Sequence, residues 1–283
     1  MSEEILKALM ELFALIVKQD GGMSANEREY VVNFLTKQLT SESVLEYLAL
    51  FDRDAGPVTS NLTEKEPAVP SVKDSVKIFA ICKKINQTLN QVQKIVVLVR
   101  LYELINANRQ YTPQRMNIIN TVAEVFKTST SEFIAIEQFV KNDTPSELNN
   151  PSILLLVPEE EECDYCRKML KGYNGTRICI LRIASVDLYF VKYYSDDQLL
   201  LNGLPISPGQ VYTFAKGGSL RSQFGQPIYY SDISSHFLAG EIIHKISFRV
   251  ENLSYKFSDG QSAVDDVSFS VEEIGRASCR ERV

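Results

Sequence analysis

One stretch of this chain occurs twice. Residues 24–51 can be placed over residues 112–139 without a gap, at one constant offset. The aligned residues keep their character, as in Ser24 with Thr112, Leu45 with Phe133 and Phe51 with Phe139. Each copy follows an apolar segment that ends in a polar loop. Because one such three-helix unit is too small to bury its apolar face alone, we expect the two copies to pack together around one core.

Apolar residues in the first 145 positions recur at intervals of three and four, which is the spacing of amphipathic helices. One such face comprises Ile5, Leu9, Leu12 and Ile16, and another comprises Val97, Leu101, Leu104 and Ile105. We expect about seven helices over residues 1–145. The segment at about 54–72 contains three prolines and no apolar period, so it is predicted to be a connecting loop.

Both copies carry a hydroxyl residue where their second helix should begin. Ser24 precedes Glu27 by three residues, which is the spacing of a capping box. Thr112 is followed by Pro113, a residue that favours the first helical position. The sequence therefore predicts N-caps at equivalent places in the two copies.

These residues resemble the TerB-like helical domain of tellurite-resistance proteins, over most of 1–145. The most specific part is LIVKQDGGMSANERE at 15–29, where Asp20 matches the acid of the family's loop. The second loop, at 106–109, has lost that acid. The resemblance implies protein partners and makes Asp20 and Glu27 weak metal candidates. Because Glu27 and Ser24 are already needed as caps, we expect no metal site.

From about residue 150 the pattern changes to that of β-strands. Residues 178–194 are β-branched and aromatic, and Asn202-Gly203 is a strong hairpin signal. Further strands are expected at 210–215, 218–222 and 226–231. Residues 150–240 are thus predicted to form a small antiparallel β-sandwich, with a small barrel as the alternative.

Within this region, LLLNGLPISPGQVYTFAKGGSLR at 199–221 resembles the later strands of a forkhead-associated (FHA-like) domain. The phosphothreonine-reading residues of that family have no counterpart here. Phosphopeptide binding is therefore not expected.

The third region, residues 244–272, reads as a pair of strands joined by a turn at Ser258-Asp259-Gly260. ISFRVENLSYKFSDGQSAVDDVSFSVEE resembles the opening hairpin of an ABC-transporter nucleotide-binding domain. The resemblance implies that Phe257, or else Tyr255, stacks on the adenine ring of ATP. The alternative is an ordinary aromatic residue on a half-buried sheet. The lysine-bearing phosphate loop of such ATPases does not occur in the sequence, so we expect this chain to be inactive and to hold no cofactor.

The last residues, 273–283, read EIGRASCRERV and continue none of these patterns. They resemble one reading frame of a common sequencing adapter. We interpret them as an artefactual tail and exclude them from the fold prediction.

Composition narrows the function classes. The net charge of −6 and the lack of a basic stripe argue against nucleic-acid binding. Apolar runs are too short to cross a membrane and no signal peptide is present, so we expect a soluble, cytoplasmic chain. The chain contains only two histidines, which argues against a His-based catalytic triad or a zinc site with histidine ligands. Cys163 and Cys166 form a lone Cys-x-x-Cys beside an acidic run, which favours incidental cysteines over zinc or redox chemistry.

The sequence thus predicts an α+β multidomain protein: a duplicated helical domain at 1–145, an FHA-like β-domain at 150–240 and a terminal hairpin at 244–272. The first hypothesis is a regulatory or docking region of an ABC-type ATPase, a half-transporter at the cytoplasmic face of the inner membrane. That parent would use ATP and Mg, a transmembrane permease domain and a second nucleotide-binding domain. The alternative is a non-enzymatic protein-interaction module in stress signalling.

A third hypothesis is a redox or hydrolytic enzyme centred on Cys163 and Cys166.

Overall fold

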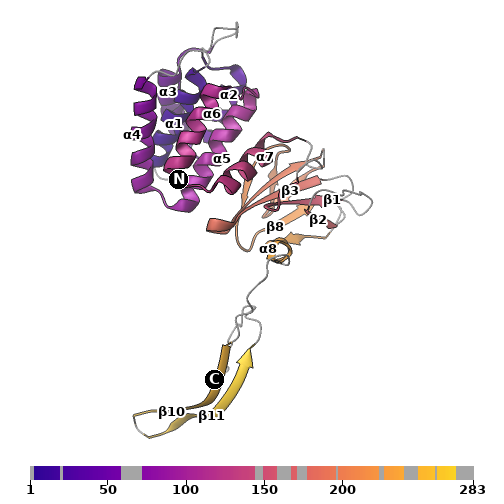
Figure 1. Cartoon of the computed structure of the whole chain (residues 1–283). Coiled ribbons are helices and arrows are strands. Elements are labelled where there is room, and N and C mark those ends of the chain that lie inside the picture. The colour runs from indigo at the N-terminus through magenta and orange to yellow at the C-terminus, as the bar shows by residue number, and fades with distance from the viewer. Residues whose placement is uncertain are drawn as a thin grey trace. The chain divides into compact units, whose positions relative to one another are not determined.

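The structure is a computed structural model. It describes residues 3–19, 22–58, 72–143, 149–157, 167–170, 177–195, 197–222, 226–238, 248–258 and 260–271. The chain divides into two compact units, residues 1–233 and residues 234–283. Seven helices precede the first strand in the described part of the chain, and Figure 1 shows them gathered in one bundle. Two sheets and a terminal hairpin follow, so the α+β class is confirmed.

The helices reproduce the repeat seen in the sequence. Their bounds are α1 (Glu3–Lys18), α2 (Ala25–Thr36), α3 (Ser41–Ala55), α4 (Val72–Thr88), α5 (Gln91–Asn108), α6 (Pro113–Val125) and α7 (Thr130–Lys141). The first residues of α5 and α6 lie at the positions that α1 and α2 reach when they are shifted by the offset between Ser24 and Thr112. Copy one is therefore α1–α3, copy two is α5–α7, and α4 stands outside the repeat. Helix α3 runs to Ala55, inside the predicted loop, and residues 59–71 of that loop lie outside the described part.

Both predicted N-caps are present. The Ser24 hydroxyl accepts a hydrogen bond from the Glu27 N–H at 3.2 Å, and the Glu27 carboxylate accepts one from the Ser24 N–H at 2.8 Å. The Thr112 hydroxyl accepts from the Arg115 N–H at 3.4 Å, with Pro113 at the first helical position. Each cap satisfies a backbone donor that the helix itself cannot pair.

The described residues of the β-region form two sheets. The five-stranded sheet has the order β2 (Arg167–Leu170), β1 (Ile153–Val157), β3 (Arg177–Ile183), β4 (Leu188–Tyr194) and β7 (Tyr212–Phe214). The four-stranded sheet has the order β6 (Leu204–Ile206), β5 (Leu199–Leu201), β8 (Ser219–Ser222) and β9 (Ile228–Tyr229). The pairing is antiparallel throughout except between β1 and β2, which are parallel.

The predicted Asn-Gly hairpin joins β5 to β6. Asn202 and Gly203 both have positive φ, 53° and 83°, which is the backbone of the tight turn that this dipeptide favours. The strand expected at 226–231 is cut short, because helix α8 (Tyr230–Leu238) begins at Tyr230. The Asp232 carboxylate accepts the Tyr229 N–H at 3.1 Å, so it satisfies a donor at the start of this helix. Helix α8 was not predicted from the sequence.

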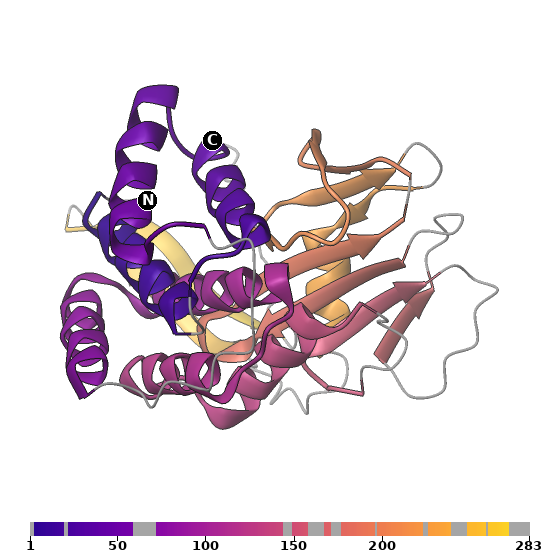
Figure 2. The same ribbon diagram turned by 90° about the horizontal axis from the view of Figure 1, so that it is seen from above.

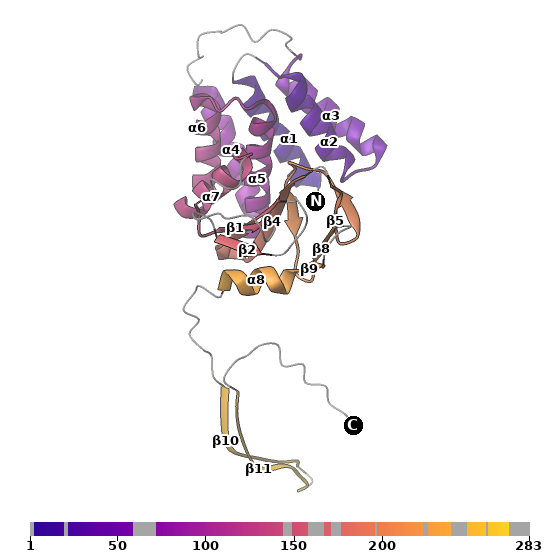
Figure 3. The same cartoon turned by 90° about the vertical axis from the view of Figure 1, so that its right-hand side faces the viewer.

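The five-stranded sheet is buried on both faces. Alternate residues of β1, namely Ile153, Leu155 and Val157, belong to the same core as the helices, and Figures 2 and 3 show the helical bundle on that side of the strands. Leu154 and Leu156 on the opposite face are also buried. On that opposite face the Tyr193 hydroxyl donates to the Ile206 carbonyl of β6 at 2.8 Å.

Two groups of polar contacts fix copy two to the sheet. Glu132 near the start of α7 accepts hydrogen bonds from the N–H and the hydroxyl of Ser185, at 2.9 and 3.0 Å. Lys192 of β4 is buried and donates to the carbonyls of Val140 and Asn142 at the other end of α7, both at 3.1 Å. A cation at a helix C-terminus is favourable, although burial lowers the pKa of Lys192.

The terminal hairpin pairs β10 (Phe248–Lys256) with β11 (Ser262–Val271) in antiparallel fashion. The register shifts three times along the ladder. Asn252 and Asp266 have positive φ at these irregularities, and the Asn252 amide donates to the Asp266 carboxylate at 2.7 Å. Such bulges bend and twist a strand pair.

Candidate functional site

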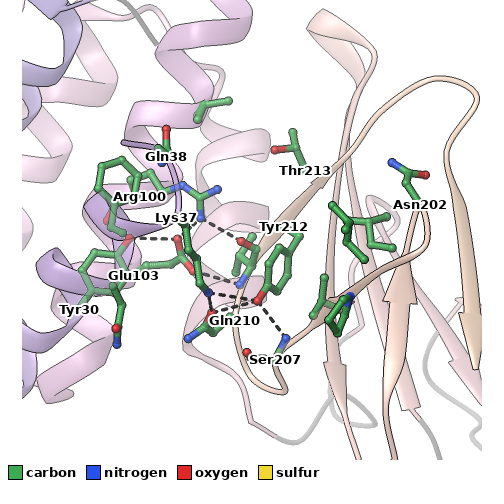
Figure 4. Close-up of a pocket in the computed structure, with 18 residues that line it drawn as sticks. Tyr30, Lys37, Gln38, Arg100, Glu103, Asn202, Ser207, Gln210, Tyr212 and Thr213 are labelled. Atoms are coloured by element: carbon green, nitrogen blue, oxygen red, sulfur yellow. Dashed lines mark hydrogen bonds and ion pairs between the residues drawn. The ribbon is translucent and has the colours of Figure 1, made fainter. Parts of the chain in front are cut away.

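A cleft lies where copy one and copy two of the repeat meet the loop between β6 and β7, and its volume is 580 Å³ (Figure 4). Helices α2 and α5 form one wall, and the segment from β5 to β7 forms the other. The residues that carry its chemistry are Tyr30, Lys37, Arg100, Glu103, Gln210 and Tyr212. We call this site the α2–α5 cleft.

Arg100 and Glu103 attach the β-region to helix α5. They form an ion pair with each other, and their side chains are only 15% and 10% exposed. The Arg100 guanidinium donates to the Val211 carbonyl at 2.9 Å, and the Glu103 carboxylate accepts the Val211 N–H at 3.1 Å. One residue of the loop therefore has both backbone groups held by a neighbouring pair of side chains.

Tyr30 completes this group from helix α2. Its hydroxyl lies 3.1 Å from the Glu103 carboxylate and 3.3 Å from the Arg100 carbonyl. Burial, together with the Glu103 charge, raises the pKa of Tyr30 well above its ordinary value. The hydroxyl therefore stays protonated at neutral pH and serves as a donor.

The mouth of the cleft holds a second polar group. The Lys37 ammonium donates to the Gln210 side-chain oxygen and to the Tyr212 hydroxyl, and it lies 5.3 Å from the centre of the Tyr212 ring. The Tyr212 hydroxyl also accepts the Ser207 N–H at 3.0 Å. Figure 4 shows these side chains meeting from α2 on one side and from the loop on the other.

Glu27, one of the two metal candidates, is fully buried and paired with Arg115 at 2.5 Å. These two residues occupy equivalent positions in the two copies, 88 residues apart. Each is also part of the N-cap in its own copy. The pair therefore joins the copies across the core. Asp20, the other candidate, lies outside the described residues, and within the described part no three acidic, cysteine or histidine side chains gather as a metal site would require.

Tyr255 and Phe257, the candidate adenine-stacking residues, lie together at the turn end of the hairpin. Their rings meet edge to face with centres 5.4 Å apart, and they are 56% and 53% exposed. Phe257 opens the turn, since its N–H donates to the Gln261 carbonyl and its carbonyl accepts the Gly260 N–H. Both rings are thus presented on the surface of this unit.

Cys163 and Cys166 lie outside the described residues. Two other cysteines, Cys82 and Cys179, are buried. Burial raises the pKa of Cys82 to about 11, so this thiol is unreactive at neutral pH.

Comparison with known proteins identifies the helical region. Residues 6–138 match the family described as Tellurite resistance protein TerB, so the chain carries a TerB-like domain over these residues. Comparison with curated proteins and with solved structures gave no match. Among the helices that the structure describes, none combines the length and apolar character needed to cross a bilayer.

The α2–α5 cleft was not predicted from the sequence. One signal was present, because Arg100 and Glu103 interrupt the apolar run from Ile95 to Ile105 that otherwise reads as buried helix. Charged residues there require polar partners. Their partner, the backbone of Val211, is more than a hundred residues away and could not be inferred from local pattern.

Proposed function

We propose that this chain is the regulatory and docking region of an ABC-type ATPase, of the half-transporter kind, and that the hairpin opens its nucleotide-binding domain. The observation that carries the proposal is the hairpin itself. None of its described side chains is buried, and five large apolar ones are at least 40% exposed: Leu253, Tyr255, Phe257, Val267 and Phe269. An isolated two-stranded hairpin is marginally stable in water, so such a surface requires further structure to cover it.

The position of the aromatic pair supports nucleotide binding in particular. Phe257 directly precedes the turn, where the resemblance to ABC ATPases puts the adenine-stacking residue. An exposed aromatic face can stack on a purine without a hydrogen bond. The TerB-like domain and the β-region would then act on the ATPase as a docking platform for protein partners.

The coding sequence beyond residue 272 in the source DNA provides the first test. A Gly-x-x-x-x-Gly-Lys-Ser/Thr loop within about 20 residues of Val271 is expected, because that loop binds the phosphates of the same nucleotide. An unrelated sequence or a stop codon there would remove the ATPase from the proposal.

The second test uses the intact protein encoded by that DNA. Phe257→Ala should weaken ATP binding about fivefold, the effect of losing one stacking contact. Phe269→Ala is the matched control, because this aromatic is similarly exposed but lies on the other strand of the hairpin. Equal effects of the two substitutions on ATP titrations would argue against stacking at Phe257.

The TerB match favours a second candidate function, a non-enzymatic interaction module in stress signalling. This function requires no downstream ATPase. Expression of the chain in a tellurite-sensitive bacterium tests it directly. Growth at a tellurite concentration that stops the control strain would support this candidate.

A further inference from the structure

We propose that the α2–α5 cleft is a binding site for a small organic anion that has an apolar body. The anionic group would be held by Lys37 at the mouth, and the body would lie against the apolar wall. This inference concerns residues 1–233 alone and holds whether or not an ATPase follows the chain.

The charge of the lining is the first argument. Among the described residues that line the cleft, Glu103 is the only carboxylate. Arg100, Tyr30 and the Val211 N–H already bind it. Its charge is therefore compensated inside the site. Lys37 donates to two neutral oxygens only, and no carboxylate pairs with it among the described residues. The lining keeps one net positive charge, so an anion is the complementary ligand.

An unused donor is the second argument. The Nε of Arg100 is buried and meets no hydrogen-bond acceptor within the described part of the chain. A buried donor without a hydrogen-bond partner raises the free energy of the folded state, so such groups in native proteins commonly bind a water or a ligand. Arg100 lines the cleft, and a polar atom of a bound molecule would satisfy this group.

The apolar wall and the size of the cleft are the third argument. Phe34 and Val96 line it from the helices, and Leu201, Leu204 and Pro205 line it from the β-region. Pockets for small molecules have volumes of about 300–1,000 Å³ and combine apolar walls with a few convergent polar groups. At 580 Å³ the cleft falls within this range. An inorganic ion alone would leave most of it unfilled.

The sequence allows a site-specific test, because the chain contains no tryptophan. Leu204→Trp puts a single reporter at the cleft, at a side chain that is 71% exposed and therefore tolerant of substitution. The probe is 8-anilinonaphthalene-1-sulfonate, an apolar anion that accepts energy from excited tryptophan. We expect saturable quenching of the Leu204→Trp emission. Gln38→Trp, on the helical wall, is a second reporter and should show the same saturation.

Two lysine variants, made in the Leu204→Trp background, test the charge argument. Lys37→Met should weaken probe binding about three- to fivefold, as expected for one exposed charge interaction. Lys83→Met is the matched control, because Lys83 is exposed on α4 and does not line the cleft. It should leave the dissociation constant unchanged.

Competition defines the ligand class. Decanoate should displace the probe, because it combines a carboxylate with an apolar chain. Inorganic phosphate and decanol, which each offer only one of these features, should displace it at least tenfold less effectively. The proposal is overturned if neither reporter is quenched at a saturating level, if Lys37→Met and Lys83→Met behave alike, or if decanol competes as well as decanoate.

Discussion

The two copies of the repeat share a backbone plan but differ in what they do with their charged residues. Shifted by the 88 residues that separate Glu27 from Arg115, four polar residues of the α2–α5 cleft fall on apolar ones. Arg100 corresponds to Leu12, Glu103 to Leu15, Tyr30 to Ile118 and Lys37 to Val125. The other copy therefore packs its helices with apolar residues at these four positions. The polar set is therefore specific to the side of the bundle where α2 and α5 meet the β-region.

Glu27 and Arg115 are the exception, because here equivalent positions carry opposite charges and bind each other. A buried ion pair contributes little net stability, but it strongly penalises any packing that separates its members. This pair therefore specifies how the two copies align.

The largest loss of stability is expected from substitutions at the Glu27–Arg115 pair, and they test whether its charges align the two copies. Arg115→Met leaves the Glu27 carboxylate buried without its partner and should lower the free energy of unfolding by about 3–5 kcal/mol. The double variant Glu27→Gln, Arg115→Met removes the unpaired charge and keeps a residue suited to the capping box. It should regain more than half of the loss in urea unfolding. A double variant as unstable as the single one would show that the cap or the packing, and not the charge, is decisive.

A smaller loss of stability is expected at Glu132, a residue of copy two that binds Ser185 beside the sheet. Glu132 corresponds to Val44 in copy one, so Glu132→Val places the residue of one copy in the other. The Ser185 N–H and hydroxyl then lose their acceptor, and the free energy of unfolding should fall by about 2 kcal/mol. Glu132→Gln keeps one acceptor oxygen and should lie between the two in thermal unfolding. No change with Glu132→Val would mean that this contact does not hold the sheet.

The smallest effects are expected at two tyrosine hydroxyls, one in each copy, Tyr30 on α2 and Tyr102 on α5. Tyr30→Phe removes the hydroxyl that binds Glu103 and should cost about 1 kcal/mol. The Tyr102 hydroxyl is buried and meets no acceptor in the described part of the chain, so Tyr102→Phe should be neutral or slightly stabilising. Urea unfolding of the two variants side by side distinguishes them. Equal losses would show that the Tyr30 hydroxyl has no special role.

The sequence was sufficient for features that depend on local pattern. The helical period, the hydroxyl caps at Ser24 and Thr112 and the Asn202-Gly203 turn are each determined by a few neighbouring residues, and all were predicted. Helix α8 was missed because its short segment is also compatible with a strand. The parallel pairing of β1 with β2 and the cleft were missed because they depend on contacts between distant parts of the chain. No local signal shows that Arg100 meets Val211.

The burial of strand β1 on both faces has a consequence for how the chain folds during synthesis. The ribosome releases the helical repeat first, and domains generally fold as they emerge. The nascent strand Ile153–Val157 therefore emerges next to a folded helical domain. That domain can cover one of the strand's two apolar faces as soon as the strand is synthesised. If the β-region were expressed without the helices, that apolar face of the strand would stay exposed to solvent. Exposed apolar strand surfaces promote aggregation.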